Sequence, residues 1–214
     1  MLSRLDEIIF PNRCEVLEIV PSQRYVYPIF KNGSSSLATE AIIQGWRPLL
    51  NQQIRKLGRI EVFLREPSVR FISGVNTFIT ETLILEPNLD PKTILYFAEN
   101  YLFLDRHFLP QFHWLIQLAR YADPNVILYL RDIAELSELT TAKENQQEVN
   151  EDLRLHLLNN QHIIKYNNLD RVLIDNFIGK ETTLIEIVTY IQNTQPVLFN
   201  KIIKHSRDIV NVLP

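Results

Sequence analysis

Short apolar runs alternate along this chain with segments whose apolar residues recur at helical spacing. The runs are residues 24–30, 59–64 and 125–130, and the helical segments that follow or separate them are 37–46, 69–79 and 110–121. Strands that alternate with helices indicate a parallel sheet joined by crossover helices. We therefore expect an α/β fold in which helices flank a parallel sheet.

After the third run the chain is dominated by helical patterns, so the last third is expected to be mostly helical. The helical segments there are 144–159, 184–191 and 196–212. An acidic stretch introduces them, and we expect it to be an exposed helix and connection without chemistry: Glu135, Glu138, Glu144, Glu148, Glu151 and Asp152. Without a low-complexity linker, residues 1–214 are expected to form a single domain, with a core of about 20–135 and a helical part of about 136–214.

Composition limits the partners, the cysteine chemistry and the cellular location that this protein can have. The net charge is −3, from 22 basic and 25 acidic residues, which does not favour a nucleic-acid partner. A single cysteine, Cys14, excludes an internal disulfide and a multi-cysteine metal site. Charged residues interrupt the apolar start of the chain, so it does not have the pattern of a signal peptide. No apolar stretch is long enough to span a membrane. We expect a soluble, cytoplasmic protein.

The first strand-to-helix turn, residues 31–36, has the composition of an anion site. Its sequence is Lys-Asn-Gly-Ser-Ser-Ser. The start of a helix leaves backbone N–H groups without internal partners, and the helix dipole favours negative charge there. Gly33 would let the backbone approach an anion closely, the serines add hydroxyl donors, and Lys31 adds a positive charge. The turn therefore predicts a site for phosphate or sulfate.

Two features limit this interpretation. The turn is not a Walker A loop, because Lys31 precedes the only glycine, and it does not match GxGxxG. A solvated turn in which a serine caps the following helix would have the same composition.

The second strand-to-helix turn, residues 65–67, is expected at the same edge of the sheet, because ligands of such sheets bind beyond the carboxyl ends of the strands. Arg65 leaves the strand and can bind a phosphate through two N–H groups. Ser73 follows about two helical turns later and offers a hydroxyl. Read alone, this segment is also consistent with an ordinary strand–helix connection and a surface arginine.

Together, and in this order, the two segments resemble the sulfotransferases that use 3′-phosphoadenosine 5′-phosphosulfate. Residues 27–37, YPIFKNGSSSL, look like the 5′-phosphosulfate loop of that family. Residues 64–76, LREPSVRFISGVN, look like the 3′-phosphate segment of its carbohydrate branch, and residues 105–111, DRHFLPQ, are similar to a third segment of that branch. The resemblance implies a P-loop-like parallel sheet, a nucleotide-binding core, and transfer of a sulfuryl group to a hydroxyl, most naturally of a carbohydrate.

The resemblance also implies a role for each matched residue. Lys31 would contact the bridging oxygen of the donor and stabilise the departing phosphate. Arg65 and Ser73 would hold the 3′-phosphate, and Arg70 would either support that pocket or face solvent. The 5′-phosphate would be held by the backbone and hydroxyls of the rest of the first turn: Asn32, Gly33, Ser34, Ser35 and Ser36.

Sulfuryl transfer needs no metal, but a general base must take the proton of the acceptor hydroxyl. The family uses a His or a Glu between the two phosphate segments or soon after them, and residues 41–60 contain no His, Asp or Glu. We favour His107, whose ordinary pKa range suits a base; a packed structural histidine is the alternative. The other candidates are Glu40, Glu61 and His113, and Gln111 could hydrogen-bond the acceptor or the donor.

The run Arg47, Arg55, Lys56 and Arg59 could attract an anionic acceptor such as an acidic polysaccharide, or could be a solvated helix face. Two other functions stay open. One is a non-catalytic nucleotide-binding or scaffold module of the same fold, since the chain is short for the family. The other is a P-loop-type small-molecule kinase, against which the position of the lysine and the lack of an obvious Mg²⁺ carboxylate after a strand both argue. The expected partner is a hydroxyl-bearing acceptor, a glycan.

Overall fold

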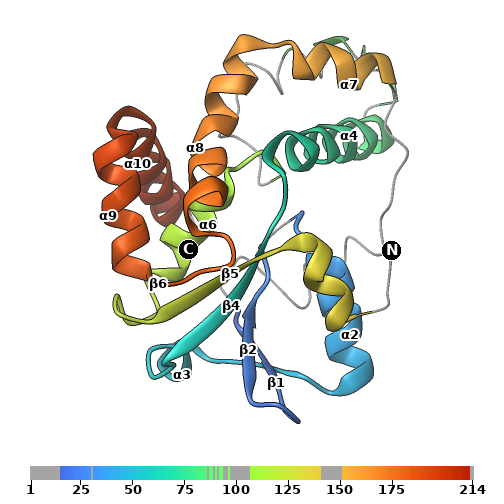
Figure 1. Ribbon diagram of the computed structural model, residues 1–214. Coiled ribbons are helices and arrows are strands. Elements are labelled where there is room, and N and C mark those ends of the chain that lie inside the picture. Colours follow the sequence, from blue (N-terminus) through green and yellow to red (C-terminus); the bar gives the residue numbers. More distant parts are fainter. Residues whose placement is uncertain are drawn as a thin grey trace.

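A six-stranded sheet forms the centre of the computed structural model (Figure 1), which describes residues 15–29, 31–85, 87–88, 90, 92–93, 96, 107–140 and 151–212. The strands lie in the order β3-β1-β2-β4-β5-β6. Their bounds are β1 Leu17–Ile19, β2 Arg24–Tyr27, β3 Arg47–Pro48, β4 Arg59–Leu64, β5 Ile127–Asp132 and β6 Glu181–Thr183.

The sheet is mixed, whereas the sequence predicted a parallel one. The three central strands β2, β4 and β5 are parallel. The outer strands β1, β3 and β6 each pair antiparallel with a neighbour. These outer strands are two or three residues long, so they carry too little of the period-two pattern to be recognised in a sequence. The α/β class is confirmed, but the predicted all-parallel sheet is wrong.

Helices follow most of the predicted segments. α10 matches its predicted range, and α4 runs well beyond the predicted 69–79. Residues 144–150 of the predicted charged helix, with Glu144 and Glu148, lie outside the described residues. The bounds are α2 Ser34–Gln44, α3 Asn51–Ile54, α4 Pro67–Leu85, α6 Gln111–Leu118, the 3-10 helix η1 Ile133–Glu138, α7 Glu151–Leu158, α8 Gln161–Phe177, α9 Leu184–Thr194 and α10 Pro196–Val212.

Helices cover both faces of the central strands (Figure 1). Ile60, Val62 and Leu64 of β4 join one buried cluster with residues of α6, α8, α9 and α10. Phe63 points to the opposite face, where it packs with α2 and with Leu136 of η1. This burial on both faces explains why β4 reads as an almost continuous apolar run.

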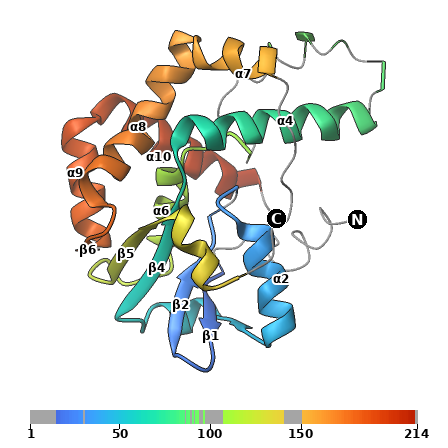
Figure 2. The ribbon, with the colours of Figure 1, turned by 45° about the vertical axis from the view of Figure 1, so that its right-hand side comes forward.

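A third cluster lies above the carboxyl ends of the strands, where α4 packs against α7 and α8 (Figure 2). Phe71 and Ile72 of α4 meet Leu157 and Ile163 there. Within the described part of the chain, no helix has both the length and the apolar character needed to cross a membrane.

Candidate functional site

The two strand-to-helix turns lie side by side at the carboxyl ends of β2 and β4. The strands are parallel neighbours, with Tyr27 opposite Val62, so both chains leave the sheet at the same edge. The Arg65 guanidinium donates a hydrogen bond to the Lys31 carbonyl oxygen through Nη1, over 3.4 Å. The structure therefore brings Lys31 and Arg65 together at one edge of the sheet.

Gly33 forms the N-cap of α2 in a left-handed conformation, with φ of 75°. The N-cap residue is a glycine, which has no side chain to cap the helix, so the predicted alternative of a serine N-cap is wrong. A Cβ atom at Gly33 would overlap Cδ2 of Leu136 on η1. The left-handed conformation thus favours glycine here, and any larger residue would also displace the Leu136 side chain, independently of the close anion approach that the sequence suggested.

A fully buried glutamine joins the two turns. Oε1 of Gln111 accepts hydrogen bonds from Asn32 Nδ2 (2.5 Å) and from the Arg65 backbone N–H (2.8 Å), and its Nε2 donates to the Arg65 carbonyl (2.8 Å). Asn32 Nδ2 also donates to the Phe63 carbonyl. The Gln111 amide is therefore engaged by the protein and fixes the spacing of the turns, rather than reaching toward an acceptor or donor as the sequence suggested. Among the described residues, Asn32 Oδ1 is buried without a hydrogen-bond partner.

Asp170 of α8 holds Gln111 in place. Its two carboxylate oxygens accept the backbone N–H groups of Gln111 (2.7 Å) and Phe112 (3.0 Å), which are the first residues of α6. Burial raises the pKa of Asp170, against the opposing influence of the Arg70 charge. No sequence pattern predicted this contact, because Asp170 lies 59 residues after Gln111 in an ordinary helical segment.

Arg70 is buried and does not face solvent, which excludes one of its two predicted roles. Its Nη1 donates to the Leu109 carbonyl over 2.6 Å, and the side chain is 2% exposed. This bond anchors the segment that leads into α6. Because Gln111 of α6 joins the two turns, Arg70 supports their arrangement indirectly.

Arg65 lies beside the Lys31 turn and is more exposed than Arg70. It is half-buried, and desolvation lowers its pKa despite the neighbouring Glu66. Among the described residues, no carboxylate lies within ion-pair distance of Arg65. A desolvated cation without a counter-ion is energetically unfavourable. An anion that bound beside Arg65 would therefore have a strongly favourable electrostatic contribution to its binding free energy.

The serines of the two turns differ in exposure. Ser34 and Ser36 are buried at the start of α2, and Ser35 is half-buried between them. Ser73 is half-buried on α4, where its carbonyl accepts a bond from Thr77 Oγ1.

Lys31 and His107 meet the same helix one turn apart. Lys31 Nζ donates to Thr77 Oγ1 over 2.7 Å, and His107 Nε2 lies 3.8 Å from Glu81 Oε1. Thr77 and Glu81 are four residues apart on α4, so they occupy one face of it. The His107 backbone packs directly on this helix, since a Cβ at Gly74 would overlap the His107 carbonyl. The two favoured catalytic residues thus contact the same face of α4.

The other base candidates are differently placed. Glu40 is buried on α2, and no contact joins it to Lys31 or His107. His113 is buried on α6, where Nε2 lies 3.2 Å from Gln117 Nε2.

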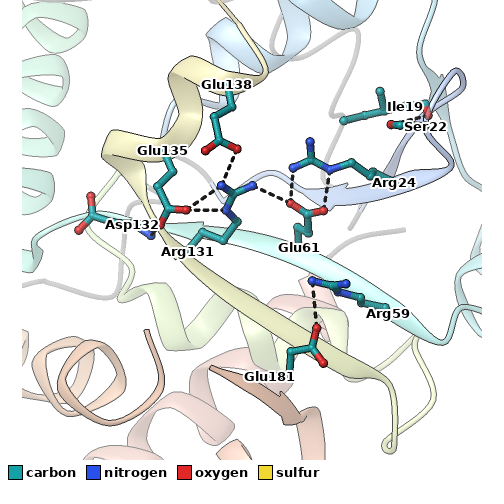
Figure 3. Close-up of polar contacts among 10 residues, drawn as sticks. All are labelled: Ile19, Ser22, Arg24, Arg59, Glu61, Arg131, Asp132, Glu135, Glu138 and Glu181. Carbon is teal, nitrogen blue, oxygen red and sulfur yellow. Dashed lines mark hydrogen bonds and ion pairs between the residues drawn. The ribbon is translucent and has the colours of Figure 1, made fainter. Parts of the chain in front are cut away.

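Glu61 lies at the centre of a charge network on the face of the sheet that η1 covers (Figure 3). Arg24 binds both of its carboxylate oxygens, at 2.7 and 2.6 Å, and Arg131 binds one at 3.2 Å. Arg131 continues the network to Glu135 (2.7 Å) and Glu138 (2.6 Å) on η1. The network therefore ties η1, which covers Gly33, to the central strands. Glu138 is exposed as expected and Glu135 is half-buried, and both are held by Arg131.

This network excludes Glu61 as the base. Burial tends to raise the pKa of Glu61, but the hydrogen bonds and charges of Arg24 and Arg131 outweigh it and hold the pKa below its ordinary value of 4.5. A carboxylate with both oxygens bound to arginines is poorly suited to take a proton.

The lowered pKa of Glu61 predicts a pH dependence of stability. Because the folded pKa is below the unfolded one, the stabilisation is complete above pH 4.5 and is lost as the pH falls through the folded pKa. The difference in free energy of unfolding between the unaltered chain and Glu61→Gln should therefore shrink on acidification. Urea unfolding between pH 3 and 7 measures it, and a difference that grows toward low pH would contradict the assignment.

The basic run lies at the other end of the strands. Arg59 is the first residue of β4 and pairs with Glu181, while Arg47 pairs with Glu18 on β1. Arg55 and Lys56 are exposed. The run is therefore far along the sheet from Lys31 and Arg65, and it does not extend their site.

A carboxylate does follow a strand at the site edge, contrary to the sequence interpretation. Asp132 is the last residue of β5, opposite Leu64 of β4. Its Oδ1 accepts the Ala134 N–H and so caps η1. Among the described residues, no group of three His, Cys, Asp or Glu side chains could hold a metal ion. Cys14 lies outside the described residues.

No protein family, curated protein or solved structure matches this chain in the comparisons made.

Proposed function

We propose that the protein is a sulfotransferase that moves a sulfuryl group from 3′-phosphoadenosine 5′-phosphosulfate to a hydroxyl, most naturally of a carbohydrate. Arg65 carries this proposal, because its half-buried guanidinium lacks a carboxylate partner among the described residues and lies beside the Lys31 turn. Two cations and the start of α2, whose N-cap is a glycine, meet at one edge of the sheet. This combination favours a ligand with more than one anionic group.

In this proposal, residues of the two turns and of α4 bind the phosphates of the donor. The first turn of α2 would hold the 5′-phosphate, and Arg65 with Ser73 would hold the 3′-phosphate. When bound, the donor supplies the sulfuryl group that the acceptor oxygen attacks. Lys31, positioned by Thr77, would stabilise the charge on the leaving phosphate oxygen. His107 would take the acceptor proton at Nε2, and the nearby Glu81 carboxylate would stabilise the imidazolium.

Arg65→Ala should weaken binding of adenosine 3′,5′-bisphosphate by about 10–100-fold, because a charge-assisted pair to the 3′-phosphate is lost. Binding of 5′-AMP, which lacks that phosphate, should change much less. Isothermal titration calorimetry with both nucleotides measures the difference. Arg55→Ala, which alters an exposed arginine at the other end of the sheet, serves as the control. An equal loss for both nucleotides would contradict the 3′-phosphate role.

A non-catalytic nucleotide-binding module is a second candidate, favoured by the burial of the base candidates. His107 is 3% exposed and Glu40 is 9% exposed, so an acceptor must displace protein to reach either. Transfer of labelled sulfate to a panel of glycans separates the two functions. Binding of the bisphosphate without transfer to any glycan or phenol would favour the module.

A P-loop-type kinase is tested by the same preparations. Asp132 supplies the carboxylate at a strand end that such chemistry needs, although it now caps η1. Magnesium-dependent protection by ATP in a melting assay, exceeding that by the bisphosphate, would favour a kinase.

A further inference from the structure

A separate cavity of about 250 Å³ lies between the start of α4 and the helices α7 and α8. Its floor is apolar and includes the buried side chains of Phe71, Ile72, Leu157 and Ile163. Figure 2 shows α7 and α8 approaching α4 at this place. An apolar cavity with a few polar groups at its mouth is the usual form of a small-molecule site, and this volume suits a ligand smaller than a nucleotide.

The mouth carries one acid and one base. Arg171 of α8 pairs with Glu66 through Nη2 and Oε1, and the two side chains are 48% and 36% exposed. Glu66 is ionised at neutral pH. Burial tends to raise its pKa, but hydrogen bonds from Ser68 and the Val69 N–H, with the Arg171 charge, hold the pKa below its ordinary value. The amides of Asn167 and Asn168 complete the polar lining.

This cavity is distinct from the proposed donor site. Successive residues of a helix are rotated by about 100°, so Ser68, Phe71 and Ile72 lie on the face of α4 opposite Thr77. Thr77 contacts Lys31, whereas Ser68, Phe71 and Ile72 line the cavity. The two sites therefore share α4 but open on different sides of it.

We propose that this cavity binds a free hydrophobic α-amino acid, such as leucine or phenylalanine. The zwitterion carries adjacent positive and negative groups that complement Glu66 and Arg171. Its ammonium would replace Arg171 at Glu66, its carboxylate would take the Arg171 guanidinium with support from the asparagine amides, and its side chain would cover the apolar floor. The existing pair is partly exposed and contributes little to stability, so a ligand can separate it readily. A ligand with a single charge would leave Arg171 or Glu66 without a partner.

Calorimetric titration of the full chain with L-leucine and L-phenylalanine tests the proposal. 4-Methylpentanoate and 3-methylbutylamine, which each lack one charge of leucine, should bind at least tenfold more weakly than leucine. Arg171→Met should weaken leucine binding at least tenfold. Arg154→Met is a matched control, because Arg154 is 49% exposed and paired with Glu151 on α7.

A second pair of variants tests whether filling the cavity with a larger side chain blocks binding. Ile164→Trp places bulk at the exposed rim of the cavity and should block leucine binding, whereas Ile185→Trp, at an exposed isoleucine of α9, should not. The proposal is overturned if neither amino acid binds, if a singly charged analogue binds as well as leucine, or if Arg171→Met and Ile164→Trp leave binding unchanged. Titration of adenosine 3′,5′-bisphosphate on the same samples separates this outcome from failure of the donor site.

Discussion

Asp170→Ala should lower the free energy of unfolding by about 3 kcal/mol. The substitution leaves the buried N–H groups of Gln111 and Phe112 without acceptors, and it removes the charge that offsets the buried Arg70 guanidinium. Part of the loss is recovered, because burial of the carboxylate is itself unfavourable, as its raised pKa indicates. Urea unfolding followed by tryptophan fluorescence measures the change.

Asp175→Ala is the control for this prediction. Asp175 lies on the same helix α8 but is exposed, so its removal should change the free energy of unfolding by less than about 0.5 kcal/mol. A comparable loss of stability in both variants would mean that α8 is sensitive to any change of charge. Asp170 would then have no special role as the acceptor of the first N–H groups of α6.

Gln111→Leu should destabilise the fold by about 2–4 kcal/mol and also weaken binding of adenosine 3′,5′-bisphosphate. Leucine fills a similar volume but leaves the N–H and C=O groups of Arg65 without their partners. The two turns would then lose the amide that fixes their spacing, so the cations at the site would be less well placed for two phosphates. Chemical unfolding and calorimetry report the two effects separately.

Gln117→Leu alters a half-buried glutamine on the same helix, whose amide contacts only His113 among the described residues. It should cost less stability and leave nucleotide binding unchanged. If Gln111→Leu binds the bisphosphate as tightly as the unaltered chain under folded conditions, the spacing of the turns does not matter for the site, even where the loss of stability is observed.

The central part of the fold was readable from the sequence because burial on both faces leaves a strong apolar signal. β4 coincides with its predicted run, β2 begins at the predicted residue but ends at Tyr27, and β5 begins two residues later than predicted. The short outer strands were not readable, because pairing with distant segments creates them. β6 forms by pairing with β5, where Thr183 lies opposite Ile127, 56 positions earlier in the chain.

The residues of the candidate site were predictable only where they lie next to a strand that the sequence revealed. Lys31 and Arg65 stood out because each follows a recognisable strand. Asp170 did not stand out, and Gln111 was expected to contact the acceptor or the donor rather than the two turns, because the partners of both residues lie 46 to 79 positions away in the chain. Glu61 was noticed as a strand residue, but a charge inside an apolar run does not reveal which arginines meet it across the sheet.

The two outermost strands have a consequence for behaviour at high concentration. β3 consists of Arg47 and Pro48, and proline has no N–H to offer a new neighbour. β6 is three residues long and begins with the charged Glu181. Neither edge of the sheet therefore offers another chain a long row of unpaired backbone N–H and C=O groups. This architecture should disfavour strand exchange and fibrous polymerisation, whatever ligand the protein carries.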